Sequence, residues 1–154
     1  MPTTPTSAFD PDLLLALGEL VVRHAAVEET LRQAIWREAQ ADHIMVDVLL
    51  TGLSFSTLID KFGAVYYEHH VPARPQINDL CSRLRTLNEQ RNALIHSFWR
   101  PSPGSPDMTR LKASAKPSSG LVLRSQGVPT TAVRTLAADL GQAEDAVWQL
   151  IARL

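Results

Sequence analysis

The chain has few of the features that mark membrane and secreted proteins. Its 154 residues include one cysteine, Cys81, which excludes an internal disulfide and any multi-cysteine zinc site. No stretch approaches the roughly 18 apolar residues that a membrane-spanning helix needs, and the first residues have no signal-peptide pattern. We therefore expect a cytoplasmic protein without membrane contacts, with a flexible N-terminus at residues 1–9 and one domain at residues 10–154.

Lysine and net charge are also scarce. Three lysines stand against twelve arginines, and the formal net charge is −1. This balance excludes a broad electrostatic footprint for nucleic acid, so any contact with RNA must be local. The chain also lacks a glycine-rich phosphate loop, which argues against a nucleotide-binding sensor. We expect no cofactor and no metal.

What the sequence does contain is apolar residues at helical spacing. Segments with apolar side chains every three or four residues, bounded by capping residues, predict helices at Pro11 to about Gln40, Asp42–Thr51, Ser54 or Ser56 to His70, Pro75–Arg100, and Thr130 or Thr131 to the C-terminal end. Residues 101–130 are rich in proline and serine and predict a loop or small hairpin. The expected fold class is all-α: an antiparallel bundle of four to five helices with an irregular or small β-hairpin insertion before the last.

Arg91 interrupts the apolar stripe of the fourth predicted helix. At about 100° per residue, seven apolar side chains fall within roughly 60° of its direction: Ile77, Leu80, Leu84, Leu87, Leu94, Ile95 and Phe98. A buried arginine needs a partner or a cleft. Asn92 and His96 lie four residues apart on one side of the same helix, so the three polar residues can line one groove.

The spacing of Arg91 and His96, with Asn92 directly after the arginine, resembles the motif of HEPN domain ribonucleases. The position of the motif on a late helix and Glu28 on the first helix are also similar to that family. The resemblance implies a helical domain and RNA cleavage by attack of a ribose 2'-hydroxyl. In that reaction His96 exchanges protons, Arg91 clamps phosphate oxygens, and Asn92 orients either His96 or the phosphate.

The same resemblance implies partners. One histidine per chain is half of an acid and base pair, and a symmetric homodimer with RNA as substrate would bring two motifs into one cleft. Such a nuclease would serve as a toxin or defence effector, with an antitoxin protein as a further partner. Family members paired with a nucleotidyltransferase antitoxin commonly carry a tyrosine two residues after the histidine. Here that residue is Phe98, which has no hydroxyl to modify.

Less specific interpretations of the same residues stay open. Arg91 can be a structural partner in a buried ion pair with Glu28, in a non-catalytic helical interaction module. His96 can be a helix C-terminal residue favoured by the dipole. Trp99 can pack in the core or stack on a base. His24 is expected to pair with Glu28 one turn away, and His69 and His70 to point apart at an exposed helix end.

Overall fold

In the computed structural model, residues 9–101, 108–116 and 120–154 are described, so the predicted flexible N-terminus lies almost entirely outside them. The described part contains five α-helices, a short 3-10 turn and three strands. In chain order these are α1 (Pro11–Ala39), α2 (His43–Leu50), α3 (Phe55–His69), η1 (Val71–Ala73), α4 (Arg74–Ile95), β1 (Phe98–Pro101), β2 (Met108–Lys116), β3 (Gly120–Val128) and α5 (Thr130–Ile151).

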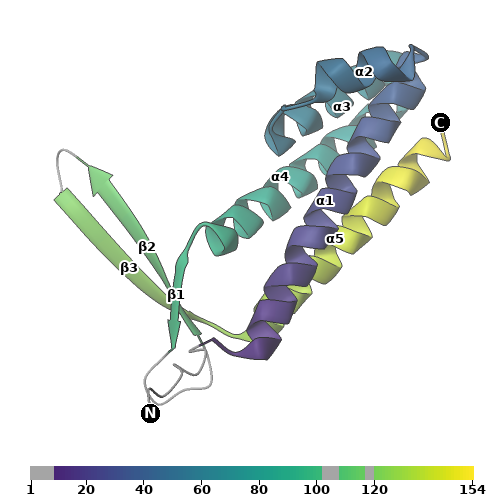
Figure 1. Cartoon of the computed structure of the whole chain (residues 1–154). Helices are drawn as coiled ribbons and strands as arrows, with labels where there is room; N and C mark the ends of the chain where they lie inside the picture. The colour runs from purple at the N-terminus through teal and green to yellow at the C-terminus, as the bar shows by residue number, and fades with distance from the viewer. Residues whose placement is uncertain (1–8, 102–107, 117–119) are drawn as a thin grey trace.

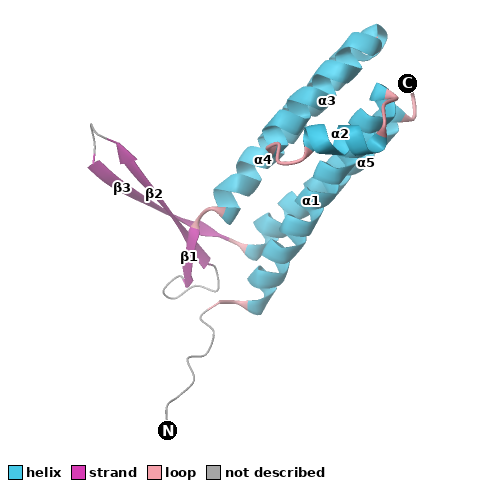
Figure 2. Ribbon diagram, turned by 45° about the horizontal axis from the view of Figure 1, so that its top comes forward, coloured by secondary structure: helices cyan, strands magenta, loops and turns pink. Residues whose placement is uncertain are grey.

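Four long helices form a bundle, and the strands project from one end of it (Figure 1). Helix α1 packs along α5 and α3, while α4 packs against α3 and α5. The short helix α2 lies beside the C-terminal part of α1, as both views show (Figure 2). The predicted fold class is therefore confirmed in its coarser form, a mostly helical bundle with a small β insertion before the last helix.

Helix starts follow the predicted capping residues in three of the five helices. The side chains of Asp10, Asp42 and Ser54 each accept a hydrogen bond from a backbone amide in the first turn of α1, α2 and α3. The predicted threonine cap of the last helix is wrong. Thr130 is already helical, and Pro129 holds the N-cap position without a side-chain hydrogen bond.

The fourth helix ends five residues earlier than the sequence predicts. Three donors compensate its last carbonyls: the Ser97 hydroxyl (2.6 Å) and Arg110 Nη1 (2.9 Å) donate to the carbonyl of Ala93, and the Trp99 indole N–H (3.1 Å) donates to that of Leu94. The chain is thereby free to leave the helix, and Phe98 lies on β1 with 76% of its surface exposed. Phe98 is not part of the helical stripe.

The insertion is a three-stranded antiparallel sheet in the order β1-β2-β3. The sequence predicted at most a hairpin, because it assigned the residues of β1 to the preceding helix. Trp99 pairs with Arg110 in the register of β1 and β2. Arg110 is therefore held beside the end of α4, where its guanidinium reaches the Ala93 carbonyl.

The core lies between the helices and is almost entirely apolar. Five leucines are fully buried in it: Leu13, Leu20, Leu31, Leu84 and Leu140. None of the described helices has the length and apolar character needed to cross a membrane. Cys81 is buried where α4 meets α3, and a Cβ added to Gly63 would lie 3.0 Å from its Sγ. A larger residue at position 63 would require the Cys81 side chain to shift by a few tenths of an ångström, so glycine favours this close approach of the two helices.

The side chains of His69 and His70 at the end of α3 converge on one residue, although the sequence predicts that they point apart. His69 Nδ1 lies 2.8 Å and His70 Nε2 3.0 Å from the same oxygen, Oε1 of Glu38 on α1. The two imidazoles can share one acceptor because α3 ends at His69, so His70 leaves the helical path. Desolvation raises the pKa of Glu38, but the hydrogen bonds from His69 and His70 outweigh it and leave that pKa below its usual value.

Tyr66 should contribute measurably to stability through one buried hydrogen bond. Its hydroxyl donates to the Ala34 carbonyl on α1 at 3.1 Å. We expect Tyr66→Phe to lower the free energy of unfolding by about 0.5–1.5 kcal/mol in urea denaturation. Tyr67→Phe is the matched control, because Arg74 stacks over the ring of Tyr67, 4.2 Å from its centroid, and needs no hydroxyl. Equal effects of the two changes would contradict this role.

Candidate functional site

Arg91 projects from the C-terminal part of α4 into a gap beside α1 and α3, and most of its donors have no partner among the described residues. Its Nη1 donates to Asn92 Oδ1 at 2.8 Å. Its Nε is enclosed by the protein and, among the described residues, has no acceptor. No carboxylate of the described residues forms an ion pair with it. The side chain is thus a partly buried cation without a counter-charge.

The predicted ion pair between Arg91 and Glu28 does not form. Glu28 Oε1 instead accepts a hydrogen bond from Arg32 Nη2 at 2.8 Å, one turn further along α1. Arg32 Nη1 also donates to the Leu50 carbonyl at 2.6 Å, which fixes the end of α2. An arginine at i+4 on the same helix reaches the carboxylate more easily than one on another helix. Glu28 remains beside the gap, but its charge is balanced by Arg32.

Asn88, His24 and Ser56 form a buried chain of hydrogen bonds in the same gap as Arg91. Asn88 Nδ2 donates to Ser56 Oγ on α3 at 3.2 Å, and Asn88 Oδ1 lies 3.3 Å from His24 Nε2 on α1. Because Oδ1 can only accept, His24 is the donor and carries its proton on Nε2. His24 therefore pairs with Asn88 and not with Glu28 as predicted.

Asn88 is the site residue that sequence reasoning missed. It is buried, with 7% of its surface exposed. The available signal was its spacing, because Asn88 precedes Arg91 by three residues and Asn92 by four, which places the three polar side chains on one face of the helix. Ser56 was considered only as a helix cap.

The surroundings of His24 keep its imidazole neutral. Burial lowers the pKa of His24 from the usual 6.5, and the positive charge of Arg91 lowers it further. The hydrogen bond to Asn88 and the charge of Glu28 oppose this shift but do not cancel it. The ring also packs against Phe55, with 4.3 Å between the ring centroids. The pKa of His24 therefore depends in part on the charge at Arg91.

The gap itself is a pocket of about 460 Å³ between α1, α3 and α4, which we call the Arg91 pocket. The N-terminal turn of α3 forms one wall. Its lining residues are Val21, His24, Ala25, Glu28, Leu53, Ser54, Phe55, Ser56, Asn88, Arg91 and Asn92. The N-terminal end of α3 and the guanidinium both contribute positive charge to this pocket, while the lining carboxylate of Glu28 is paired with Arg32.

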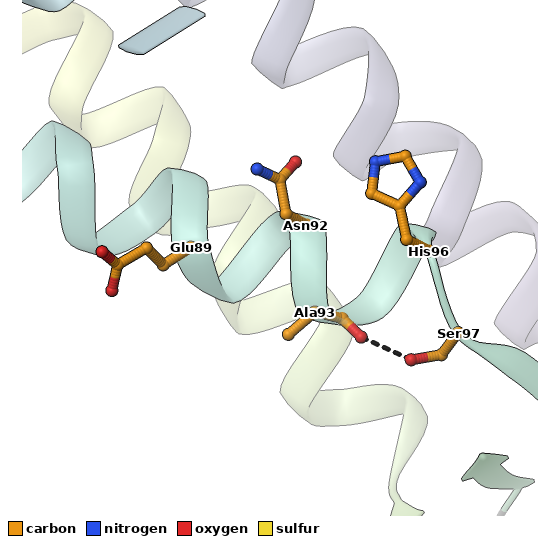
Figure 3. A pocket seen from close by; sticks show the side chains of 5 residues that line it. All are labelled: Glu89, Asn92, Ala93, His96 and Ser97. Carbon is orange, nitrogen blue, oxygen red and sulfur yellow. Dashed lines mark hydrogen bonds between the residues drawn. The ribbon is translucent and has the colours of Figure 1, made fainter. Parts of the chain in front are cut away.

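His96 opens into a different pocket. It lines a hollow of about 410 Å³ with Glu89, Asn92, Ala93 and Ser97, here called the His96 pocket. The side chains of Asn92 and His96 project from the same side of α4, while Glu89 points away from them (Figure 3). Asn92 lines both pockets and so lies between Arg91 and His96. Of the three predicted catalytic residues, Arg91 and His96 face separate hollows within one chain, and Asn92 lines both.

His96 is exposed and lies at the C-cap of α4, where its backbone amide donates to the Asn92 carbonyl. The hydrogen bonds from Ser97, Trp99 and Arg110 to the last turn fix the backbone on which it stands. Trp99 lies on β1, partly buried against the core, and not on the helix beside His96 as predicted. Base stacking by Trp99 remains a prediction.

Comparison with protein-family models, with curated proteins and with solved structures gives no match for this chain. Among the described residues, no three His, Cys, Asp or Glu side chains are grouped so that they could hold a metal ion. The residues around Arg91 and His96 remain the candidate site.

The proximity of Arg91 to His24 gives a prediction for titration. Removing the charge in Arg91→Gln should raise the pKa of His24, because the imidazolium would no longer face a cation. Histidine-selective NMR titration of the variant and the wild type measures the shift. Arg83→Gln, on the same helix but bonded to Gln142 of α5, should leave His24 unchanged. A lower or equal pKa in Arg91→Gln would contradict the contact.

Proposed function

We propose that the chain is a metal-independent endoribonuclease of HEPN type, acting as a toxin or defence effector, with Arg91 and His96 of two subunits forming the cleavage site. The observation that carries the proposal is an arginine without a carboxylate partner, five residues before an exposed histidine, with Asn92 between them. Fold alone would not justify this function, because helical bundles serve many roles.

The chemistry needs no group that these residues lack. A base takes the proton from the ribose 2'-hydroxyl, whose oxygen attacks the adjacent phosphorus, and the bond from phosphorus to the 5'-oxygen breaks. An acid protonates that leaving oxygen, so the products are a 2',3'-cyclic phosphate and a free 5'-hydroxyl. His96 suits either proton transfer, since one imidazole nitrogen can accept a proton and the other can donate one. Arg91 stabilises the developing charge on the phosphate oxygens.

A homodimer is supported by an unpartnered apolar face on α1. Leu14, Gly18, Val21, Val22 and Ala25 follow one another at helical spacing on the side of α1 that faces away from the core, and Val22 is 67% exposed. Val21 and Ala25 also line the Arg91 pocket. A two-fold contact through this α1 face would therefore bring the two Arg91 pockets near the symmetry axis.

An antitoxin protein is a further proposed partner, but not one that adenylylates the motif. The position two residues after His96 is Phe98, whose ring is 76% exposed on β1. An enzyme could reach this side chain, yet it offers no hydroxyl to accept a nucleotide.

RNA cleavage is the direct test. We expect the purified protein to cut single-stranded RNA in EDTA and to leave 2',3'-cyclic phosphate ends, detected by mass spectrometry. His96→Ala should reduce the rate by about 10²–10⁴-fold and Arg91→Gln by about 10²–10³-fold. Arg83→Gln is the matched control and should cleave like the wild type. If His96→Ala and Arg91→Gln both retain full activity, the assignment is wrong.

The α1 face gives a separate prediction. Val22→Glu places a charge in the centre of the proposed interface and should convert the dimer to a monomer in sedimentation velocity, with loss of RNA cleavage. Val71→Glu, at a 57% exposed valine on η1, is the control and should remain dimeric. A wild-type protein that cleaves RNA as a monomer would refute the composite site.

The alternative, a non-catalytic helical interaction module, is favoured by one observation. Helix α2 exposes Ile44, Met45, Val48 and Leu49, each at 58% or more. An apolar surface of this kind is typical of protein contacts. The ion pair between Arg91 and Glu28, on which the interaction-module hypothesis was first based, does not form among the described residues. Growth inhibition that survives His96→Ala would favour this alternative.

A further inference from the structure

The Arg91 pocket has an excess of hydrogen-bond donors over acceptors. Arg91 uses only Nη1, toward Asn92, so the rest of its guanidinium has no acceptor among the described residues. Glu28 is the acidic side chain in the lining, and Arg32 already holds it at 2.8 Å. A cation in a partly enclosed pocket without its own counter-charge favours an anionic ligand.

The first turn of α3 adds donors to the same pocket. Ser54 caps the helix and occupies the amide of Thr57, and its carbonyl accepts from Leu58. The amides of Phe55 and Ser56 have no acceptor within the helix, because they belong to its first turn. Both residues line the Arg91 pocket. Amides at a helix N-terminus together with an arginine are a combination that binds phosphate.

The hydrogen bonds of Asn88 with His24 and Ser56 leave the hydroxyl of Ser56 as a further donor. His24 donates to Asn88 Oδ1, which leaves the Asn88 amide nitrogen to donate to Ser56 Oγ. Because Ser56 Oγ accepts this hydrogen bond, its own proton is available to donate into the pocket. Donors from α3 and α4 therefore converge from different directions, which suits a tetrahedral anion better than a planar carboxylate.

We propose that the Arg91 pocket is a phosphate-binding site formed by Arg91, Ser56 and the first-turn amides of α3, and that it holds a backbone phosphate of single-stranded RNA. The choice of RNA as the source of the phosphate rests on the proposed function. The phosphate site itself does not. Since His96 faces another hollow in the same chain, this phosphate is bound apart from that subunit's own His96.

The first arm of the test uses inorganic phosphate, titrated into the full chain and followed by NMR of the backbone amides and of His24. We expect saturable shifts at Phe55 and Ser56. The pKa of His24 should also rise, because the bound anion offsets the charge of Arg91. Arg91→Gln should weaken binding at least tenfold and Ser56→Ala several-fold, while Arg91→Lys should retain part of it. Arg83→Gln should bind like the wild type.

Binding that is equally strong in Arg91→Gln, or equally weakened in Arg83→Gln, would overturn the site, because either result indicates non-specific attraction. Circular dichroism of each variant shows whether it is folded. If Arg91→Gln is unfolded, Ser56→Ala and Arg91→Lys decide the question alone: wild-type affinity in both overturns the proposal.

The second arm uses a single-stranded 2'-O-methyl RNA oligonucleotide, which lacks the hydroxyl needed for cleavage. It should displace inorganic phosphate and produce the same His24 shift. Phosphate binding without competition by the oligonucleotide would overturn RNA as the source and indicate a free phosphate ester. Cleavage of ordinary RNA without phosphate binding in the pocket would refute this inference alone. Phosphate binding without any cleavage would refute the nuclease alone.

Discussion

The hydrogen bonds of one buried side-chain amide, that of Asn88, connect the three helices that form the candidate site. A buried amide must satisfy both its oxygen and its nitrogen, and Asn88 does so with His24 on α1 and Ser56 on α3. This requirement acts together with the buried apolar residues of α4 to set the rotation of the helix about its axis. Arg91 and Asn92, three and four residues later, then face the same gap between α1 and α3. The polar residues that α4 contributes to that gap therefore depend on how Asn88 is placed.

The arrangement carries an energetic cost at Arg91. An enclosed donor without an acceptor costs about 1–3 kcal/mol, and the Arg91 Nε is such a donor. Structures usually accept costs of this kind at sites that bind something, because a ligand can supply the missing acceptor. Replacing Arg91 by leucine, the residue type that its neighbours on the stripe suggest, would remove the cost. An arginine at this position is therefore better explained by ligand binding than by packing in the core.

Local patterns predicted most of the helices but not what depends on distant contacts. The caps at Asp10, Asp42 and Ser54 use neighbours in sequence, so the starts of these three helices could be predicted to within two residues. The end of α4 depends on Arg110, which only the pairing of β1 and β2 brings to the Ala93 carbonyl, so the helix was predicted too long. Likewise, Arg91 was recognised as unusual from its own helix. The surroundings of Arg91 could not be predicted in the same way. Glu28 pairs with Arg32 instead of Arg91, and the role of Asn88 depends on contacts with the distant helices α1 and α3.

The close contact between Gly63 and Cys81 gives the chain a natural reporter. Burial raises the pKa of the Cys81 thiol, so both access and thiolate formation are suppressed in the folded state. Cys81 is only 4% exposed, at the base of a hollow between α3 and α4, so local separation of these helices should speed its reaction with a thiol reagent. These two helices also carry Ser56 and Arg91. The alkylation rate of the chain's single cysteine is thus sensitive to movement between two of the helices that line the Arg91 pocket, without any introduced label.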